Sequence, residues 1–398
     1  MKINIFLKSI LAMVFIYTNP VFALPEGYDQ TNLTPPISCS GILGVFMNDQ
    51  FQECVLFGHA SSGKSPHNSA SRNTRGASDE IWQFNTVTET YSPFYQSELH
   101  SAETYQIKSA SDVYIDTSTL PLTFYIADQD PYINPWEYGG LWKAQDLNSD
   151  NDIDDENEML LLTPAISGFL TYITGVVVDT SSGNVFASEA AGPGDTLIYL
   201  CDDIPPEGNG NGVFDLSEIH SYFTHPGTSY GYGAFLTFDH LNPQIIYTID
   251  SAGTFYQLED SNENGVIDTD EYLEFPLLFG GFGIATDPDG HIFASASEWQ
   301  GNHALFQITP GNPPVAVLYD DLTEQASWMG SVKFGTGTSF EPYVKDTKLY
   351  VNYTDPSGLD PNLFLSYQGS LPEVPSLSIA SGIFGMIIIG YLVFRKKP

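Results

Sequence analysis

An aromatic strand recurs six times along the chain, at intervals of 50 to 60 residues. In each copy one or two aromatic side chains stand among aliphatic ones. The copies are Ile81-Trp82-Gln83-Phe84, Leu141-Trp142-Lys143, Ile198-Tyr199-Leu200, Phe255-Tyr256-Gln257-Leu258, Leu305-Phe306-Gln307-Ile308 and Leu363-Phe364-Leu365. Strands that repeat at this period with turns between them are typical of the blades of a β-propeller.

A pair of shorter strands precedes most copies of the aromatic strand. Residues 175–179 and 182–188 form one pair, and residues 283–287 and 289–295 form another, each with an Asp, a Gly-containing turn and an apolar strand. Looser pairs cover residues 112–116 with 122–126, 236–239 with 244–247, and 332–334 with 348–351. A β-solenoid needs a shorter period, and a β-sandwich does not explain the repeated turn. The sequence therefore predicts an all-β fold, a six-bladed β-propeller over residues 39–370.

Three consecutive units carry an acidic loop after the aromatic strand, at residues 146–158, 202–218 and 260–271. The third follows the EF-hand calcium pattern, with Gly265 at the sharp turn and Ile267 as the apolar anchor. Its predicted ligands are Asp260, Asn262, Asn264, the carbonyl of Val266, Asp268 and Glu271. The alternative is a solvated turn rich in Asp and Asn.

The other two loops depart from the pattern. In the first, Asn151 replaces the glycine and Asn157 falls at position twelve, so Glu158 would have to close the site one residue late. Its other predicted ligands are Asp146, Asn148, Asp150, the carbonyl of Asp152, and Asp154. In the second loop, position one falls on Glu207, and Asp203 is the alternative. The remaining predicted ligands of that loop are Asn209, Asn211, the carbonyl of Val213, Asp215 and Glu218.

The charge balance favours cations as ligands. The chain has 13 Lys and Arg residues against 49 Asp and Glu, for a formal net charge of -36. Nucleic acid is a poor candidate partner because phosphate binding needs a basic face. We expect calcium as the cofactor, three EF-hand-like sites in all.

The N-terminal residues predict export. Lys2 and Lys8 flank an apolar run over residues 10–17, and cleavage after Ala23 would remove a signal peptide of residues 1–23. Residues 24–38 are Pro-rich and predict an extended arm. In an oxidising compartment Cys39 and Cys54 could pair, and we expect Cys201 to be a buried thiol.

The C-terminal residues predict a membrane segment. Residues 377–394 are uncharged, long enough to span a bilayer, and followed by a basic tail at 395–398. With the Pro- and Glu-containing spacer at 371–376, this order resembles the PEP-CTERM class of bacterial sorting signals, which implies a membrane protease of the exosortase type as partner. Val374 interrupts the Pro-Glu-Pro core, and a plain membrane anchor is the alternative. Both place the body of the protein in the cell envelope or outside the cell.

The layout of residues 80–370 resembles bacterial six-bladed propellers of the gluconolactonase-like and quinoprotein sugar-dehydrogenase-like groups. The resemblance rests on repeats and turns, so it implies a fold rather than an activity. Gly281-Phe282-Gly283-Ile284 stands where gluconolactonase-like proteins carry Asn-Gly, and the few basic residues do not favour a quinone site.

No motif of a nucleophile elbow, a zinc protease or a Cys-x-x-Cys site is present. We therefore expect a binding or structural module that contacts an extracellular polysaccharide or protein. The alternative is an extracytoplasmic lactone hydrolase or sugar dehydrogenase that uses the propeller channel.

Overall fold

The computed structural model describes residues 28–33, 39–59, 80–96, 107, 109–128, 140–155, 157–164, 170, 173–191, 194–203, 205, 208–227, 235–277, 280–298, 301–311, 314–326, 328–335, 347–354 and 363–369. The predicted signal peptide, spacer, C-terminal apolar segment and basic tail lie outside these residues. Within them, no helix has both the length and the apolar character needed to cross a membrane.

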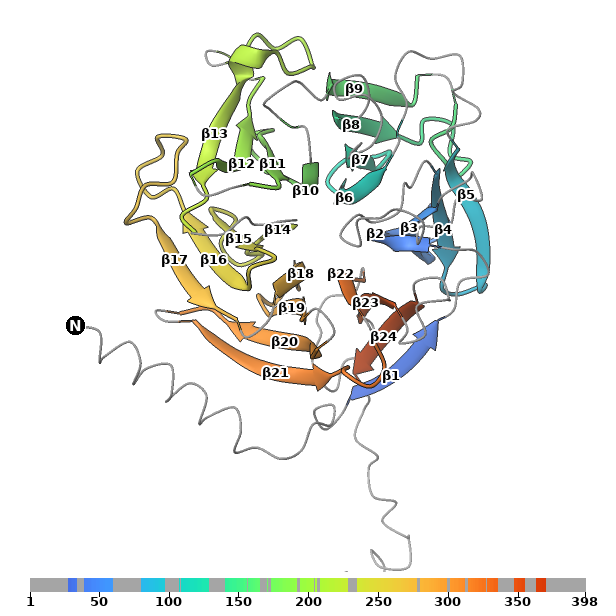
Figure 1. Cartoon of the computed structure of the whole chain (residues 1–398). Coiled ribbons are helices and arrows are strands. Elements are labelled where there is room, and N and C mark those ends of the chain that lie inside the picture. Colours follow the sequence, from blue (N-terminus) through green and yellow to red (C-terminus); the bar gives the residue numbers. More distant parts are fainter. Residues whose placement is uncertain are drawn as a thin grey trace, which may run out of the picture.

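Six four-stranded antiparallel sheets surround a central axis (Figure 1). From the axis outward, blade 1 contains β2 (Cys39–Met47), β3 (Glu53–His59), β4 (Glu80–Asn85) and β5 (Thr90–Gln96). Blade 2 contains β6 (Ala110–Asp116), β7 (Thr123–Asp128), β8 (Gly140–Gln145) and β9 (Met159–Pro164), and blade 3 contains β10 (Ile173–Val178), β11 (Val185–Glu189), β12 (Thr196–Cys201) and β13 (Ile219–Thr224). Blade 4 contains β14 (Phe235–Phe238), β15 (Ile245–Ile249), β16 (Thr254–Glu259) and β17 (Tyr272–Pro276), and blade 5 contains β18 (Gly280–Thr286), β19 (Ile292–Ser297), β20 (His303–Thr309) and β21 (Val315–Asp321). Blade 6 contains β22 (Trp328–Phe334), β23 (Lys348–Thr354), β24 (Leu363–Gly369) and β1 (Tyr28–Leu33).

The predicted six-bladed propeller is confirmed. The six aromatic segments are the third strands of the six blades, β4, β8, β12, β16, β20 and β24. The paired segments before them are first and second strands, such as β10 with β11 and β18 with β19. The repeat is visible in the sequence because the third strand lies between two neighbours of its own blade and is buried at most of its positions, which are mainly apolar.

The N-terminal arm that we expected is instead partly a strand. Residues 28–33 form β1, which pairs antiparallel with β24 and completes blade 6. Gln30 Nε2 donates to the Tyr367 hydroxyl (3.2 Å) and to Asp320 Oδ2 of blade 5 (3.3 Å). The Tyr28 ring packs edge-on against Tyr319, with 5.5 Å between ring centroids. The first strand of the chain therefore closes the ring.

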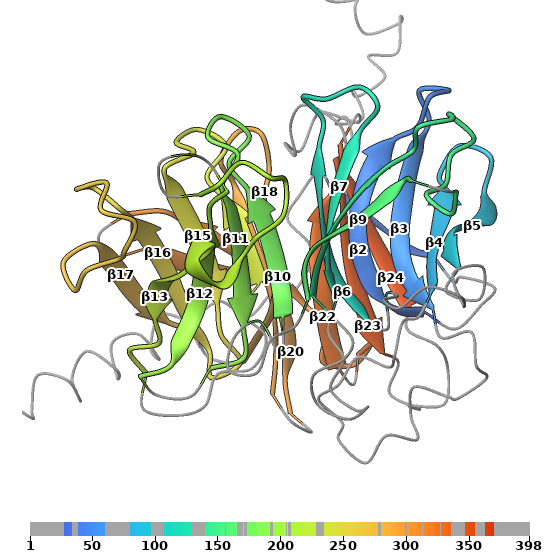
Figure 2. The same ribbon diagram turned by 90° about the horizontal axis from the view of Figure 1, so that it is seen from above.

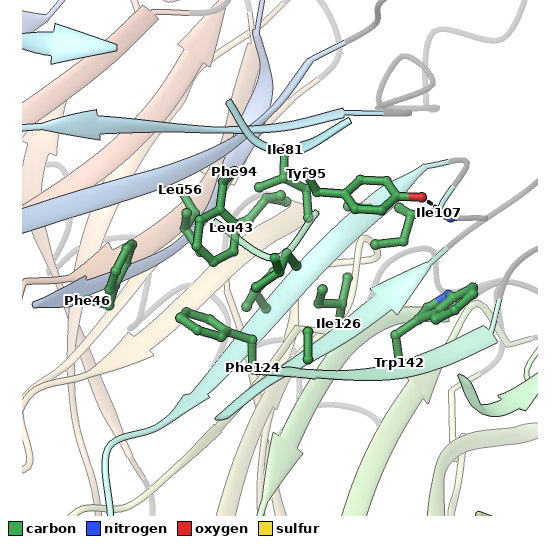
Figure 3. Packing of buried hydrophobic residues seen from close by; sticks show 14 of the residues in the cluster. Leu43, Phe46, Leu56, Ile81, Phe94, Tyr95, Ile107, Phe124, Ile126 and Trp142 are labelled. Atoms are coloured by element: carbon green, nitrogen blue, oxygen red, sulfur yellow. Dashed lines mark hydrogen bonds between the residues drawn. The ribbon is translucent and has the colours of Figure 1, made fainter. Parts of the chain in front are cut away.

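Aromatic side chains fill the space between blades. Phe46 and Phe94 of blade 1 and Phe124 of blade 2 form a mutual cluster with centroids 5.0 to 5.7 Å apart (Figure 3). Nearby, the Ile107 amide donates to the Tyr95 hydroxyl (3.2 Å). Such aromatic pairs add about 0.5–1.5 kcal/mol each beyond their area burial.

Small residues and hydroxyls join the inner strands around the axis. Ser331 of β22 donates to the Ile42 carbonyl of β2 (2.6 Å), and Ser111 of β6 donates to the Ile173 carbonyl of β10 (2.9 Å). At Gly283 of β18, an added Cβ would lie only 2.7 Å from the Gly330 carbonyl oxygen of β22. Glycine is therefore required there for the two inner strands to approach each other.

The two ends of the strands define two faces of the disc (Figure 2). One face carries the connections from the first to the second strand and from the third to the fourth strand of each blade, and we call it the turn face. The opposite face carries the connections from second to third strands and from blade to blade. All three acidic loops join a third strand to a fourth, β8 to β9, β12 to β13 and β16 to β17, so they share the turn face.

The suggested Cys39–Cys54 disulfide is wrong. Cys39 pairs with His59 at one end of the β2–β3 hairpin, whereas Cys54 pairs with Phe46 at the other, and Cys54 is a free buried thiol. Seven strand residues span roughly 20 Å, far beyond the reach of a disulfide. Cys201 is a free buried thiol, as predicted.

Removing β1 should destabilise the whole ring. A chain that begins at residue 34 leaves the outer edge of blade 6 unpaired and the ring open. We expect its melting temperature to fall by ten degrees or more relative to a chain that begins at residue 28, as measured by calorimetry. Equal melting of the two chains would contradict the role of β1 as the closing strand.

The buried thiols should resist modification. Burial, reinforced by the neighbouring Glu53 carboxylate, raises the pKa of Cys54 to about 11. At pH 8 only about one thiol in a thousand is then the reactive thiolate. In a Cys39→Ser background, we expect a thiol reagent to modify neither remaining cysteine in the native protein and both after unfolding.

Candidate metal centres

The three acidic loops begin with a carboxylate in the same arrangement. Asp146, Asp203 and Asp260 each accept a hydrogen bond through Oδ2 from the backbone N–H of the residue at the sharp turn. These bonds run from Asn151 to Asp146 (2.8 Å), from Gly212 to Asp203 (2.7 Å) and from Gly265 to Asp260 (2.8 Å). Asp203 therefore holds position one of the second loop, and Glu207 lies outside the described residues.

The sharp turn uses the left-handed backbone region in every loop. The φ angle is 73° at Asn151, 86° at Gly212 and 79° at Gly265. Asn enters this region at lower cost than other non-glycine residues. This explains how the first loop keeps the turn without glycine.

The third and fifth residues of each loop each accept a backbone N–H from the residue two positions further along the chain. The side-chain oxygen at position three accepts the N–H of position five, and the oxygen at position five accepts the N–H of position seven. At position three, the side-chain oxygens of Asn148, Asn209 and Asn262 accept the backbone N–H groups of Asp150, Asn211 and Asn264, respectively, all at 3.0 Å. At position five, the side-chain oxygens of Asp150, Asn211 and Asn264 accept the backbone N–H groups of Asp152 (3.3 Å), Val213 (2.9 Å) and Val266 (2.8 Å), respectively.

In the first loop, the residue equivalent to Asp215 and Asp268 is Asp155, not the predicted ligand Asp154. The position-three amide donates to the position-nine carboxylate in all three loops, from Asn148 to Asp155 (2.5 Å), from Asn209 to Asp215 (2.9 Å) and from Asn262 to Asp268 (3.3 Å). Asp154 is a one-residue insertion. Its Oδ1 instead accepts a hydrogen bond from the backbone N–H of Gln96 in blade 1 (2.7 Å). Counting backward from Glu158 places Asp155 at this position.

A buried glutamate closes each loop. Glu158, Glu218 and Glu271 are 3%, 2% and 8% exposed. One oxygen of each accepts an N–H near the start of the loop, from Leu147 (2.7 Å), Asn209 (2.7 Å) and Asn262 (3.1 Å). The other accepts the N–H of position nine, from Asp155 (3.2 Å), Asp215 (2.7 Å) and Asp268 (3.0 Å). Glu158 therefore takes the closing position despite its apparent displacement.

The carboxylates of the first and third loops differ in electrostatic environment. Burial raises the pKa of Glu158 and of Asp146, although backbone N–H groups partly oppose the shift. Hydrogen bonds from the Asp268 amide and the Ser261 hydroxyl lower the pKa of Glu271. Within the described residues, none of the three closing glutamates forms an ion pair with Lys or Arg, so their charge is met by N–H and O–H dipoles.

The donor set suits a hard cation. Each loop carries Asp, Asn and Glu side-chain oxygens, the type of ligand that calcium takes. The position-three amide now presents its nitrogen to the position-nine Asp, so a cation there requires the amide to turn its oxygen inward. Among the described residues, no group of three or more His, Cys, Asp or Glu side chains is gathered closely enough to hold a metal ion.

The eighth residue of each loop joins the loop to the preceding blade. Ile153, Phe214 and Ile267 are buried, at 0%, 8% and 8% exposure. Their N–H groups donate to carbonyls of the neighbouring outer strand, from Ile153 to Phe94 of β5 (2.9 Å), from Phe214 to Leu162 of β9 (2.7 Å) and from Ile267 to Tyr222 of β13 (2.7 Å). Of these three residues, the sequence analysis identified only Ile267 as an anchor, and it identified none of the partners, because a backbone bond between blades leaves no side-chain signature.

An ion pair and a hydrogen bond link the inner strands of three blades. Lys333 Nζ on β22 lies 2.5 Å from Asp112 Oδ1 on β6, and Asp112 Oδ2 accepts the Val176 amide of β10 (3.2 Å). Asp112 is 1% exposed. One lysine thus joins the inner strands of blades 6, 2 and 3.

A buried contact between a histidine and an aspartate joins blades 3 and 4 on the opposite face. His225 Nε2 lies 3.2 Å from Asp250 Oδ2, which also accepts the Tyr256 hydroxyl (3.1 Å). His225 is 1% exposed. Its depth indicates a structural contact rather than a residue that meets a substrate.

Known proteins share the fold with this chain. No protein-family model matches the sequence, and no curated protein matches it. A protein of unknown function from Dyadobacter fermentans aligns with a TM-score of 0.53 and 8% identity, over 86% of this chain and all of the other. A glucose dehydrogenase aligns with a TM-score of 0.52 and 10% identity, over 85% and 98%.

A calcium-binding protein, regucalcin from Agrobacterium tumefaciens, aligns with a TM-score of 0.49 and 10% identity, over 88% of this chain and 96% of the other. At these identities the matches to solved structures show a shared propeller fold and nothing about ligand or activity.

The left-handed turns should respond differently to substitution. Gly265→Ala places a Cβ 3.7 Å from Leu200 Cδ2, an ordinary contact, so its cost comes from the positive φ alone. We expect a loss of about 1–2 kcal/mol in the free energy of unfolding. Asn151→Gly should change it by less than about 0.5 kcal/mol, because Asn already tolerates this region. Denaturant titration measures both, and equal losses would contradict the shared turn.

Proposed function

We propose that this protein is an exported, calcium-stabilised β-propeller that works as a binding or structural module at the cell envelope. The observation that carries the proposal is the repetition of one hydrogen-bond network in three loops, each joined through its eighth residue to the preceding blade. A solvated acidic turn would not need three buried glutamates in equivalent positions.

Calcium would act in two ways on this arrangement. It would place positive charge beside each buried glutamate, and it would hold the loop that fastens one blade to the next. An ion that binds only the native state stabilises it by about 2.7 kcal/mol per site at a hundred times Kd. Extracellular calcium modules commonly bind at about 0.1–1 mM, which suits a structural role outside the cytoplasm.

The proposed location rests on the predicted signal peptide and membrane segment and on the charge of the chain. A signal peptide over residues 1–23 and an apolar segment over 377–394 would keep the propeller outside the cytoplasmic membrane, anchored or released by a sorting protease. The partners that we propose are an envelope polysaccharide or another extracellular protein. Lactone hydrolysis or sugar oxidation in the channel is the alternative, but Asp112 there is engaged by Lys333 and the Val176 amide.

Calcium should raise the melting temperature, and a chelator should reverse the rise. We expect Glu271→Gln to remove about a third of the calcium-dependent stabilisation, since it withdraws a charged ligand from one loop of three. Calorimetry with calcium and with chelator measures both effects. A melting temperature indifferent to calcium would sink the proposal.

A second substitution pair tests the reassigned ligand. Asp155→Asn should weaken calcium binding by the first loop roughly tenfold or more, because it removes a charged oxygen from position nine. Asp154→Asn keeps an oxygen that can accept the Gln96 amide, so calcium binding should stay within about twofold of the parent. Isothermal titration compares them, and the reverse order would restore Asp154 as the ligand.

A further inference from the structure

We infer that the turn face lies against an anionic phospholipid surface, with its apolar turns entering the interface and calcium in the three loops bridging to headgroup phosphates. This inference rests on the proposed calcium binding and membrane anchor. It adds to them an orientation of the propeller and a lipid ligand.

Exposed apolar side chains mark the turns between first and second strands on this face. Phe51 of blade 1, Leu120 of blade 2 and Leu241 of blade 4 are 87%, 91% and 70% exposed. Phe51 also adopts a positive φ of 57°, an unfavourable conformation for a large residue in an exposed turn. Apolar tips of this kind on one face indicate an interaction surface.

Each acidic loop adds one more exposed aliphatic side chain to the same face. Leu147, Leu216 and Val266 are 54%, 56% and 44% exposed. They stand at different positions of their loops, so the calcium-binding pattern does not require them. Every proposed ion would therefore lie within a few residues of an apolar side chain that can enter a lipid interface.

The ends of the described chain lie at the turn face. β24 runs from Leu363 to Gly369, and Gln368 pairs with Lys348, the residue that follows the first-to-second-strand connection of blade 6. Only residues 370–376 separate Gly369 from the apolar segment that begins at residue 377. Seven fully extended residues span at most about 25 Å. A bilayer that holds the apolar segment therefore begins within about 25 Å of this end of β24, which lies at the turn face.

The negative charge of the loops explains why the contact with an anionic surface should need calcium. Without metal the loops present carboxylates, which an anionic surface repels. One calcium in each loop adds two positive charges there. Calcium takes six to eight oxygens, and phosphate oxygens are ligands of the same hard type as the loop carboxylates.

A fluorescence experiment on the full chain tests the orientation. An environment-sensitive label is attached at Leu120→Cys or Leu241→Cys, and for the matched control at Ala252→Cys, an exposed position in the β15–β16 connection on the opposite face. The Cys39→Ser background leaves two buried thiols that do not label. The protein is inserted into vesicles of phosphatidylglycerol and phosphatidylethanolamine, or of phosphatidylcholine alone.

We expect calcium to raise emission at positions 120 and 241 at least twofold in the anionic vesicles, with little change at 252 and reversal by chelator. No greater response at 120 and 241 than at 252 would overturn the inference. If the protein still floats with the vesicles and calcium still raises its melting temperature, the proposed function survives that result. Absence of the calcium-dependent melt or of flotation would instead overturn both.

Two further outcomes decide the nature of the surface. An equal rise in phosphatidylcholine vesicles would overturn calcium bridging to anionic headgroups. A rise that occurs without vesicles and grows with protein concentration would assign the face to a second copy of the chain and overturn the lipid surface.

Discussion

Every blade of this protein depends on its neighbours for burial, and this dependence governs the rest of the structure. A four-stranded sheet is apolar on both faces here, as the run of buried residues along β10 and β11 shows. Two faces can be covered only by two other blades, so the arrangement is stable only as a closed ring. The aromatic clusters, the serine hydroxyls near the axis and the Lys333–Asp112 pair all act at junctions between blades.

The acidic loops belong to the same system of junctions. In a helical EF-hand the eighth residue pairs with a second loop, whereas here it pairs with the outer strand of the preceding blade. Each loop thus replaces the edge contact that an outer strand lacks. The buried closing glutamate of each loop therefore belongs to a loop that is also bonded to the neighbouring blade.

The sequence predicted the repeated features and missed those set by one position. Six aromatic strands and their paired partners were visible because burial makes most of their residues apolar. The turn at Asn151 and the closing role of Glu158 were also recoverable. Asp155 was missed because a one-residue insertion shifts the frame, and counting from the start of the loop hides it. The strand at residues 28–33 and the separation of Cys39 from Cys54 depend on pairing register, which composition does not reveal.

The closing strand has a consequence for the order in which the protein can fold. Gln30 bonds to Tyr367 across 337 residues of sequence, so nearly the whole chain must be present before the ring can shut. Contacts so distant in sequence make folding slow, and an incomplete chain exposes the unpaired edge of β24. A chain crossing a membrane from its N-terminus would deliver β1 first and its partner last. The folded ring would then form only after translocation was nearly complete. Until that point the chain would stay unfolded and able to pass through the membrane.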